Sequence, residues 1–131
     1  MHRSRLASII IDCKTEDLDA ATRFWSRALG KEARPLPGDN THYRELKTHE
    51  DEPTLLVQQV DHESRVHLDI ETDDMEAEVK RLEALGARKV GFVKRWWVME
   101  SPTGQRFCVV NPQRGGKVGP HANEWDEEPT P

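Results

Sequence analysis

Three ionisable side chains alternate with apolar ones in the stretch SRVHLDIETDD, residues 64–74. In an extended strand successive side chains point to opposite faces, so His67, Asp69 and Glu71 are expected to share one face. A histidine beside carboxylates can bind a divalent metal or transfer a proton. Two interpretations of His67 stay open at this point: a structural, hydrogen-bonded side chain, and a metal ligand or general base. For the whole face, the alternatives are solvated surface and the wall of a polar cavity.

The elements that would position these residues repeat along the chain. The motif ALG recurs at an offset of 56. At an offset of 57 four residues recur and a fifth is replaced by a similar one, Asp12, Thr15, Asp17, Leu18 and Ala20 matching Asp69, Thr72, Asp74, Met75 and Ala77. Hydrophobic periodicity predicts β-α-β-β-β in about residues 5–60 and again in about 65–112. We therefore predict an α+β fold in which two such modules form a curved mixed sheet around a cleft, as one domain over residues 1–112.

Two helices are expected, near residues 16–29 and 73–85. Thr15 can cap the first, and Asp73 and Glu76 have the spacing of a capping box at the start of the second. After residue 112 the chain is rich in Gly, Pro and acidic residues without a period, so residues 113–131 are expected to be a loose tail.

Composition narrows the functional classes. The 131 residues suit one domain, and a net charge of −5 makes nucleic acid and anionic membranes poor partners. No apolar run approaches the ~20 residues that span a bilayer, and the N-terminal stretch resembles a first strand rather than a signal peptide. A cytoplasmic protein with two buried free thiols, Cys13 and Cys108, is the expectation, although the sequence leaves a disulfide open.

Several other side chains have competing interpretations. Trp96 and Trp97 are adjacent and should face opposite sides, so one is expected in the core and the other on a cleft wall, where an aromatic face suits a flat ligand. Cys108 is interpreted as a small buried hydrophobe, with a nucleophilic role as the minor alternative. Asp12 and Asp69 are interpreted as helix caps or as acceptors for loop amides. Phe24 and Trp25 are interpreted as core residues.

Taken together, IIIDC, RFWSRALG, LLVQQV, SRVHLDIET, LGAR and MESPTGQRFCVV resemble the vicinal-oxygen-chelate superfamily, and more closely its bacterial glyoxalase-like domain group. The superfamily includes glyoxalase I, extradiol dioxygenases and bleomycin-resistance proteins. The resemblance covers about residues 5–112 and implies the paired-module fold and a homodimer. We further expect the acidic tail with Trp125, which lies outside the resemblance, to pack on the partner.

The resemblance also implies a metal site of up to four His, Glu or Gln side chains. His67 matches one ligand, Gln58 falls near a second, Ile10 occupies a third position, and Cys108 occupies the fourth. Ile10 donates nothing, Gln58 is a weak neutral ligand, and a thiolate favours Zn²⁺ over Fe²⁺ or Mg²⁺. His67 and Cys108 could bind Zn²⁺ with Asp69 or Asp12 as a third donor, which departs from the family geometry.

These residues predict a small-molecule-binding protein with a degenerate metal site, of the kind that sequesters an aromatic or drug-like ligand. Gln58, His67, Asp69, Trp96, Trp97 and Cys108 are the expected ligand-binding residues, and no tightly bound cofactor is expected. The alternative is a metal-dependent lyase, isomerase or dioxygenase acting on a substrate with vicinal oxygens. In that case His67 is the catalytic residue, and His67 and Gln58 are the ligands of Zn²⁺ or Fe²⁺.

Overall fold

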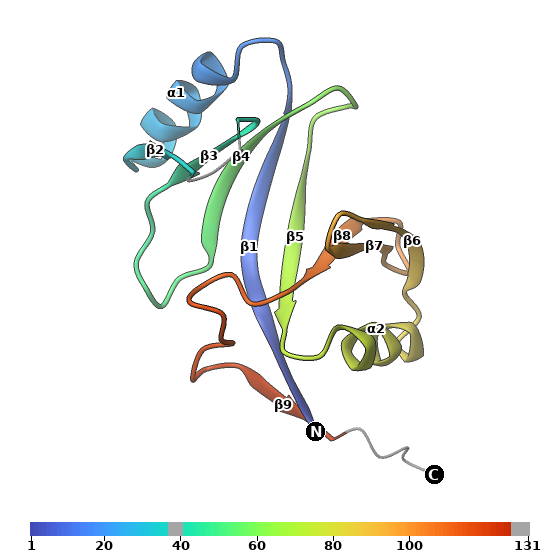
Figure 1. Cartoon of the computed structure of the whole chain (residues 1–131). Helices are drawn as coiled ribbons and strands as arrows, with labels where there is room; N and C mark the ends of the chain where they lie inside the picture. The colour runs from blue at the N-terminus through green and yellow to red at the C-terminus, as the bar shows by residue number, and fades with distance from the viewer. Residues whose placement is uncertain (37–40, 127–131) are drawn as a thin grey trace. The chain divides into compact units, whose positions relative to one another are not determined.

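A computed structural model describes residues 1–36 and 41–126 of the chain (Figure 1). The described elements are β1 (His2–Lys14), α1 (Leu18–Leu29), β2 (Ala33–Pro35), β3 (Tyr43–Leu46), β4 (Thr54–Val60), β5 (Arg65–Thr72), α2 (Met75–Ala84), β6 (Arg88–Val93), β7 (Trp96–Glu100), β8 (Arg106–Val110) and β9 (Asn123–Trp125). The predicted α+β class and both β-α-β-β-β successions are therefore confirmed. Neither helix in the described ranges is long and apolar enough to cross a membrane.

The chain divides into two compact units. The N-terminal unit is Ser8–His67, and the C-terminal unit combines Met1–Ala7 with the described residues from Leu68 onward. The division falls inside two strands, β1 and β5, and the first residues of β1 belong with the second repeat rather than the first. The cleft expected between the modules stays a prediction.

The N-terminal unit is a mixed sheet with α1 packed on one face. β2, β3 and β4 pair antiparallel, and β4 pairs parallel with Ser8–Lys14 of β1. Buried Leu18 of α1 contacts Leu46 and Val57, which are both fully inaccessible. Burial of this apolar area is the main source of the unit's stability.

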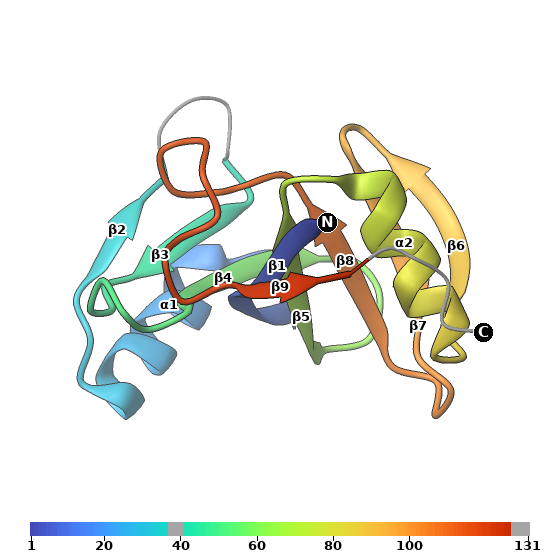
Figure 2. The ribbon, with the colours of Figure 1, turned by 90° about the horizontal axis from the view of Figure 1, so that it is seen from below.

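The C-terminal unit repeats this arrangement. β5 pairs parallel with β8, and β8, β7 and β6 pair antiparallel. Val79 and Leu82 of α2 pack against Met99 and Val109, which are fully buried in the sheet. An additional strand, β9, pairs antiparallel with the start of β1 (Figure 2). The expectation of a loose tail is therefore wrong for at least residues 123–125.

Both helices begin two residues later than predicted, because a different residue caps each. The Asp17 carboxylate accepts from the Ala20 amide at 3.0 Å, and the Asp74 carboxylate accepts from the Ala77 amide at 3.1 Å. The expected caps Thr15 and Asp73 are wrong. Gly30 ends α1 in the left-handed conformation, as glycine readily does.

Asp17→Ala should lower the free energy of unfolding by about 1 kcal/mol, because an amide at the start of α1 loses its acceptor. Chemical denaturation measures the change. Glu16→Ala is the matched control, since Glu16 is an exposed neighbour outside the cap. Equal losses in both variants would contradict the assignment of Asp17 as the cap.

Candidate functional site

The imidazole of His67 is held by a buried carboxylate of the same unit. His67 Nδ1 lies 2.7 Å from Oδ2 of Asp12, a β1 residue that is only 2% exposed. An ionised carboxylate oxygen only accepts, so Nδ1 carries the hydrogen and donates it. Arg65, two residues before His67 on β5, places its Nε 3.7 Å from the same oxygen. The pair fixes the orientation of the ring and makes Nε2 the nitrogen that would bind a metal or accept a proton.

Gln58 lies in the row of side chains that contains Asp12. Asp12 is directly opposite Gln58 on β4, and Gln58 is directly opposite Tyr43 on β3. Directly paired residues point to the same face, and neighbouring Val57 packs against α1, so this row faces away from α1. Ile10, two residues before Asp12, is 1% exposed on the same face. The position where the resemblance implies a metal-binding residue is thus filled by a buried hydrocarbon side chain.

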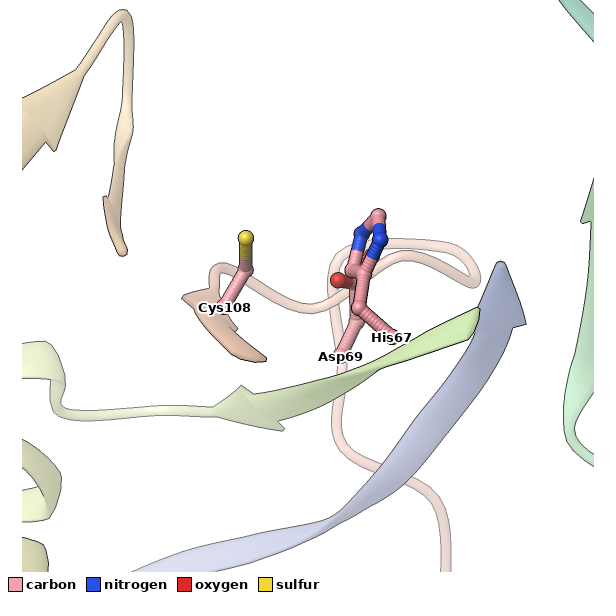
Figure 3. Close-up of side chains that lie close together, drawn as sticks. All are labelled: His67, Asp69 and Cys108. Atoms are coloured by element: carbon pink, nitrogen blue, oxygen red, sulfur yellow. The ribbon is translucent and has the colours of Figure 1, made fainter. Parts of the chain in front are cut away.

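Three potential metal donors meet on β5 and its neighbour β8. One ligand atom each of His67, Asp69 and Cys108 lies within 4.8 Å of the other two, and all three residues are partly buried (Figure 3). The local cause is strand geometry. His67 and Asp69 are two residues apart on one continuous strand, and Asp69 is directly opposite Cys108 in the β5–β8 ladder. This donor group contains one nitrogen, one oxygen and one sulfur ligand.

The two adjacent tryptophans of β7 face opposite sides of the sheet. Trp97 packs against the α2-side core and makes an edge contact with Phe92, the ring centroids being 5.2 Å apart. Val98 is directly opposite Cys108, so the alternation of β7 puts Trp96 on the Cys108 face. Of the two, Trp96 is the residue placed to offer an aromatic surface beside the donor group.

Positive charge also lies on the Cys108 face. Glu100 shares this face with Val98, and its carboxylate accepts from Arg106 Nε at 3.0 Å and Arg88 Nε at 3.1 Å. Hydrogen bonds from Arg106 and then Arg88 hold the pKa of Glu100 below its usual range. One carboxylate therefore serves two guanidinium groups, which leaves a net positive charge in this row of side chains.

Several interpretations from the sequence need correction. Asp12 and Asp69 do not cap the helices, since Asp17 and Asp74 do, and Asp12 instead binds His67. Phe24 is not in the core, because its side chain is 62% exposed. Cys108 is only partly buried and lies beside polar side chains, so it does not act simply as a core hydrophobe.

The thiols also differ in their surroundings. Both Cys13 and Cys108 are free thiols, as expected, but each is only partly buried rather than buried. Burial raises the pKa of the Cys13 thiol, and a hydrogen bond with Trp25 offsets only part of that increase. Cys13 lies on the α1 side of its sheet, away from the donor group, and provides an internal control for Cys108.

Comparison with known proteins agrees with this fold. Residues 8–110 match the family described as "Glyoxalase-like domain". The chain belongs to that family. No curated protein gives a significant match to the sequence.

The solved structures that resemble this glyoxalase-like chain are distant in sequence. A hypothetical protein from Bacillus halodurans is 12% identical, with a TM-score of 0.58, over 88% of this chain and 99% of that one. The Mn(II)-bound glyoxalase from Novosphingobium aromaticivorans is 18% identical, with a TM-score of 0.58, over 85% of this chain but only 40% of its own length. A glyoxalase/bleomycin resistance protein/dioxygenase superfamily member from Vibrio splendidus is 18% identical, with a TM-score of 0.53, over 81% of this chain and 98% of that one. The predicted glyoxalase-like family is confirmed by the match over residues 8–110, and these solved structures share its fold.

Asp12→Asn should change the tautomer of the His67 ring. The amide can present its NH₂ to Nδ1, which would move the imidazole hydrogen to Nε2. Long-range ¹H–¹⁵N NMR correlations of the imidazole distinguish the two tautomers. An unchanged tautomer in Asp12→Asn would show that another contact orients His67, and Asp17→Asn serves as a control that leaves the ring alone.

Proposed function

We propose that this glyoxalase-like protein binds a small organic molecule at the polar face of β5 and β8, beside a weak Zn²⁺ site formed by His67, Asp69 and Cys108. The observation that carries the proposal is the convergence of three chemically different donors within 4.8 Å. The bond between Asp12 and His67 supports it, because a carboxylate behind a metal-binding imidazole orients the ring and raises its basicity.

The donor set fits Zn²⁺ better than the harder divalent ions. Zn²⁺ accepts imidazole nitrogen, carboxylate oxygen and thiolate sulfur, and three protein ligands leave a fourth position for a ligand or water. Mg²⁺ and Mn²⁺ prefer oxygen donors, whereas Cys108 offers sulfur. Ile10 excludes the four-ligand arrangement that the family resemblance implies, and Gln58 lies in the Asp12 row rather than among the three donors.

The remaining residues suit recognition of an organic ligand. A bound Zn²⁺ would act as a Lewis acid toward an oxygen of that ligand. Trp96 offers an aromatic surface on the same strand face as Cys108, and Arg106 adds positive charge two residues away along β8. A ligand with a flat ring and an electron-rich oxygen would match these groups.

A second function is favoured by one observation, the bond between Asp12 and His67. A histidine whose Nδ1–H is bound by a buried carboxylate can use Nε2 as a general base. This arrangement supports a lyase, isomerase or dioxygenase acting on a substrate with vicinal oxygens. Turnover distinguishes the two functions, because an enzyme would convert its substrate to product, whereas a binding protein would release its ligand chemically unchanged. A homodimer and a cytoplasmic location accompany both proposals.

Zinc binding tests the proposal directly. Purified without a His-tag and stripped of metal, the protein should bind close to one Zn²⁺ per chain, and Co²⁺ should give the absorption of a thiolate–cobalt bond. His67→Ala and Cys108→Ser should abolish this signal, and Asp12→Asn should weaken affinity about 10–100-fold. Binding should strengthen as pH rises, because the thiol and the imidazole must lose protons to bind.

Cys13→Ser is the matched control, because it removes a thiol on the opposite side of its sheet and should leave Zn²⁺ affinity unchanged. Loss of the cobalt signal in Cys13→Ser, or its persistence in Cys108→Ser, would refute the assignment of the donors. Ligand binding is measured separately by thermal shift against aromatic carboxylates and phenols, with Trp96→Ala expected to lose the stabilisation and Phe24→Ala to retain it.

A further inference from the structure

The segment after β8 returns to the beginning of the chain, and we call residues 113–125 the C-terminal strap. Its first contact is the Gln113 amide, which donates to the buried carboxylate of Glu71 at 3.2 Å. The guanidinium of Arg3 then donates to the carbonyl of Gly119 at 3.1 Å. The strap ends in β9, whose Trp125 is directly opposite His2.

β9 fills one edge of β1. The backbone amide of Arg3 donates to Asp73 at 2.8 Å, and its carbonyl accepts from the Thr72 hydroxyl at 3.0 Å. Because neighbouring residues of a strand direct their backbone groups to opposite edges, those of His2 and Ser4 point the other way. β9 pairs with them on that second edge, where Glu124 also brings its carboxylate 3.9 Å from Arg3.

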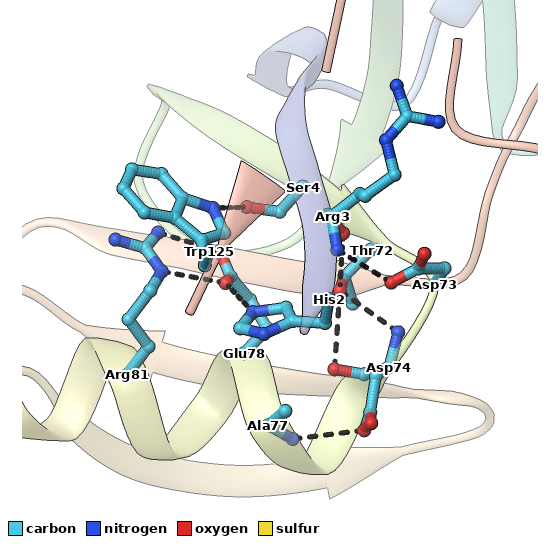
Figure 4. A network of polar contacts seen from close by, with 10 residues as sticks. All are labelled: His2, Arg3, Ser4, Thr72, Asp73, Asp74, Ala77, Glu78, Arg81 and Trp125. Carbon is cyan, nitrogen blue, oxygen red and sulfur yellow. Dashed lines mark hydrogen bonds and ion pairs between the residues drawn. The ribbon is translucent and has the colours of Figure 1, made fainter. Parts of the chain in front are cut away.

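Side chains hold the strap in place (Figure 4). The indole Nε1 of Trp125 donates to the Ser4 hydroxyl at 2.8 Å, and the guanidinium carbon of Arg81 lies 3.9 Å from the indole ring centre. Arg81 is fixed in turn by two hydrogen bonds to Glu78, at 2.8 and 2.9 Å. Trp125 is therefore held between a hydroxyl acceptor and a positioned cation.

The carboxylate of Glu78 is fully buried and also lies 2.7 Å from His2 Nε2. Burial raises its pKa, but hydrogen bonds from Arg81, His2 and Ser4 outweigh that effect and leave the pKa below its usual value of 4.5. The lowered value means that ionisation of Glu78 stabilises the folded state. The other charged groups of this network are Arg3, Asp73, Asp74 and Glu124.

Glu78→Gln should remove a pH-dependent contribution to stability. A carboxylate with a lowered pKa contributes stability above its usual pKa, and loses it as pH falls below 4.5 toward the folded-state value. Unfolding free energies measured across this range should fall less steeply for Glu78→Gln than for the unaltered chain. Glu76→Gln is the control on the exposed side of α2, and a matching change there would contradict the role of Glu78.

We propose that the first residues of β1 form a strand-acceptor site, and that the strap of a second copy of this chain occupies it when the chain's own strap cannot reach. The fit is specific. The acceptor offers Arg3 to the carboxylate of Glu124 and offers Ser4 and Arg81 to Trp125, so a strap from another copy would make the same contacts. Exchange of an identical segment is an inexpensive route to a dimer, because few new contacts are required.

Glycines in the strap allow its return to its own β1. Gly115 and Gly116 have φ values of 67° and 73°, in a region that other residues seldom adopt, and a Cβ at either position would meet nothing within 4 Å. They therefore serve the backbone path and not a packing contact. Shortening the chain here changes the reach of the strap without altering β9 or its acceptor.

The test removes Gly115 and Gly116 from the otherwise full chain and measures molecular mass by analytical ultracentrifugation. The shortened chain should have twice the mass of the unaltered chain. Trp125→Ala in the same background should cancel the doubling, because the strap loses both its hydrogen bond and its contact with Arg81.

A cysteine pair in the shortened chain provides the second measurement. With Cys13 and Cys108 replaced by Ser and Gly115 and Gly116 removed, Arg3→Cys and Glu124→Cys place a thiol at each of the two positions that lie directly opposite each other when β9 pairs with β1. Oxidation should give a disulfide-linked dimer whose fraction increases with protein concentration. The proposal is overturned if every disulfide forms within one chain at all concentrations, or if the mass of the shortened chain does not respond to Trp125→Ala.

Discussion

The alternation of side chains along β5 is the constraint on which the rest of the structure depends. Every second residue faces α2, so Ile70 enters the apolar core while Asp69 points to the opposite face. A shift of one residue in the β5–β8 register would exchange these faces and bury the charged groups under α2. The free energy of the α2-side core therefore fixes the register, and the register in turn determines which side chains meet at the donor group.

Three carboxylates are buried in the part of the chain that the structure describes, and each is paired with a basic side chain. Asp12, Glu71 and Glu78 are each at most 2% exposed, and removing a charge from water is expensive unless it is paired. Asp12 is paired with His67, Glu71 with Arg5, and Glu78 with Arg81 and His2. Removal of these partners would leave a buried carboxylate without its compensating hydrogen bonds, which makes each partner important for stability.

Much of the fold is predictable from the sequence, because the internal repeat and the helical periodicity are local signals. The error in the caps has a clear origin. Thr15 and Asp17 are both good cap residues by type, and only the backbone conformation selects one. β9 is harder to predict, since Asn-Glu-Trp has no apolar alternation and forms a strand only because β1 offers an edge. The contact of Asp12 with His67 joins residues 55 positions apart, and no local pattern indicates it.

The repeat has a consequence for how the two halves diverged. If both descend from one duplicated ancestral module, positions 10 and 67 began as the same residue, as did positions 12 and 69. One pair now differs, Ile10 against His67, while the other remains aspartate in both copies. The two aspartates nevertheless have different contacts. Asp12 is buried and hydrogen-bonded to the imidazole of His67, and Asp69 lies close to the thiol of Cys108. The same aspartate in the two repeats thus has two different chemical environments, and the residue two positions before it differs between the repeats.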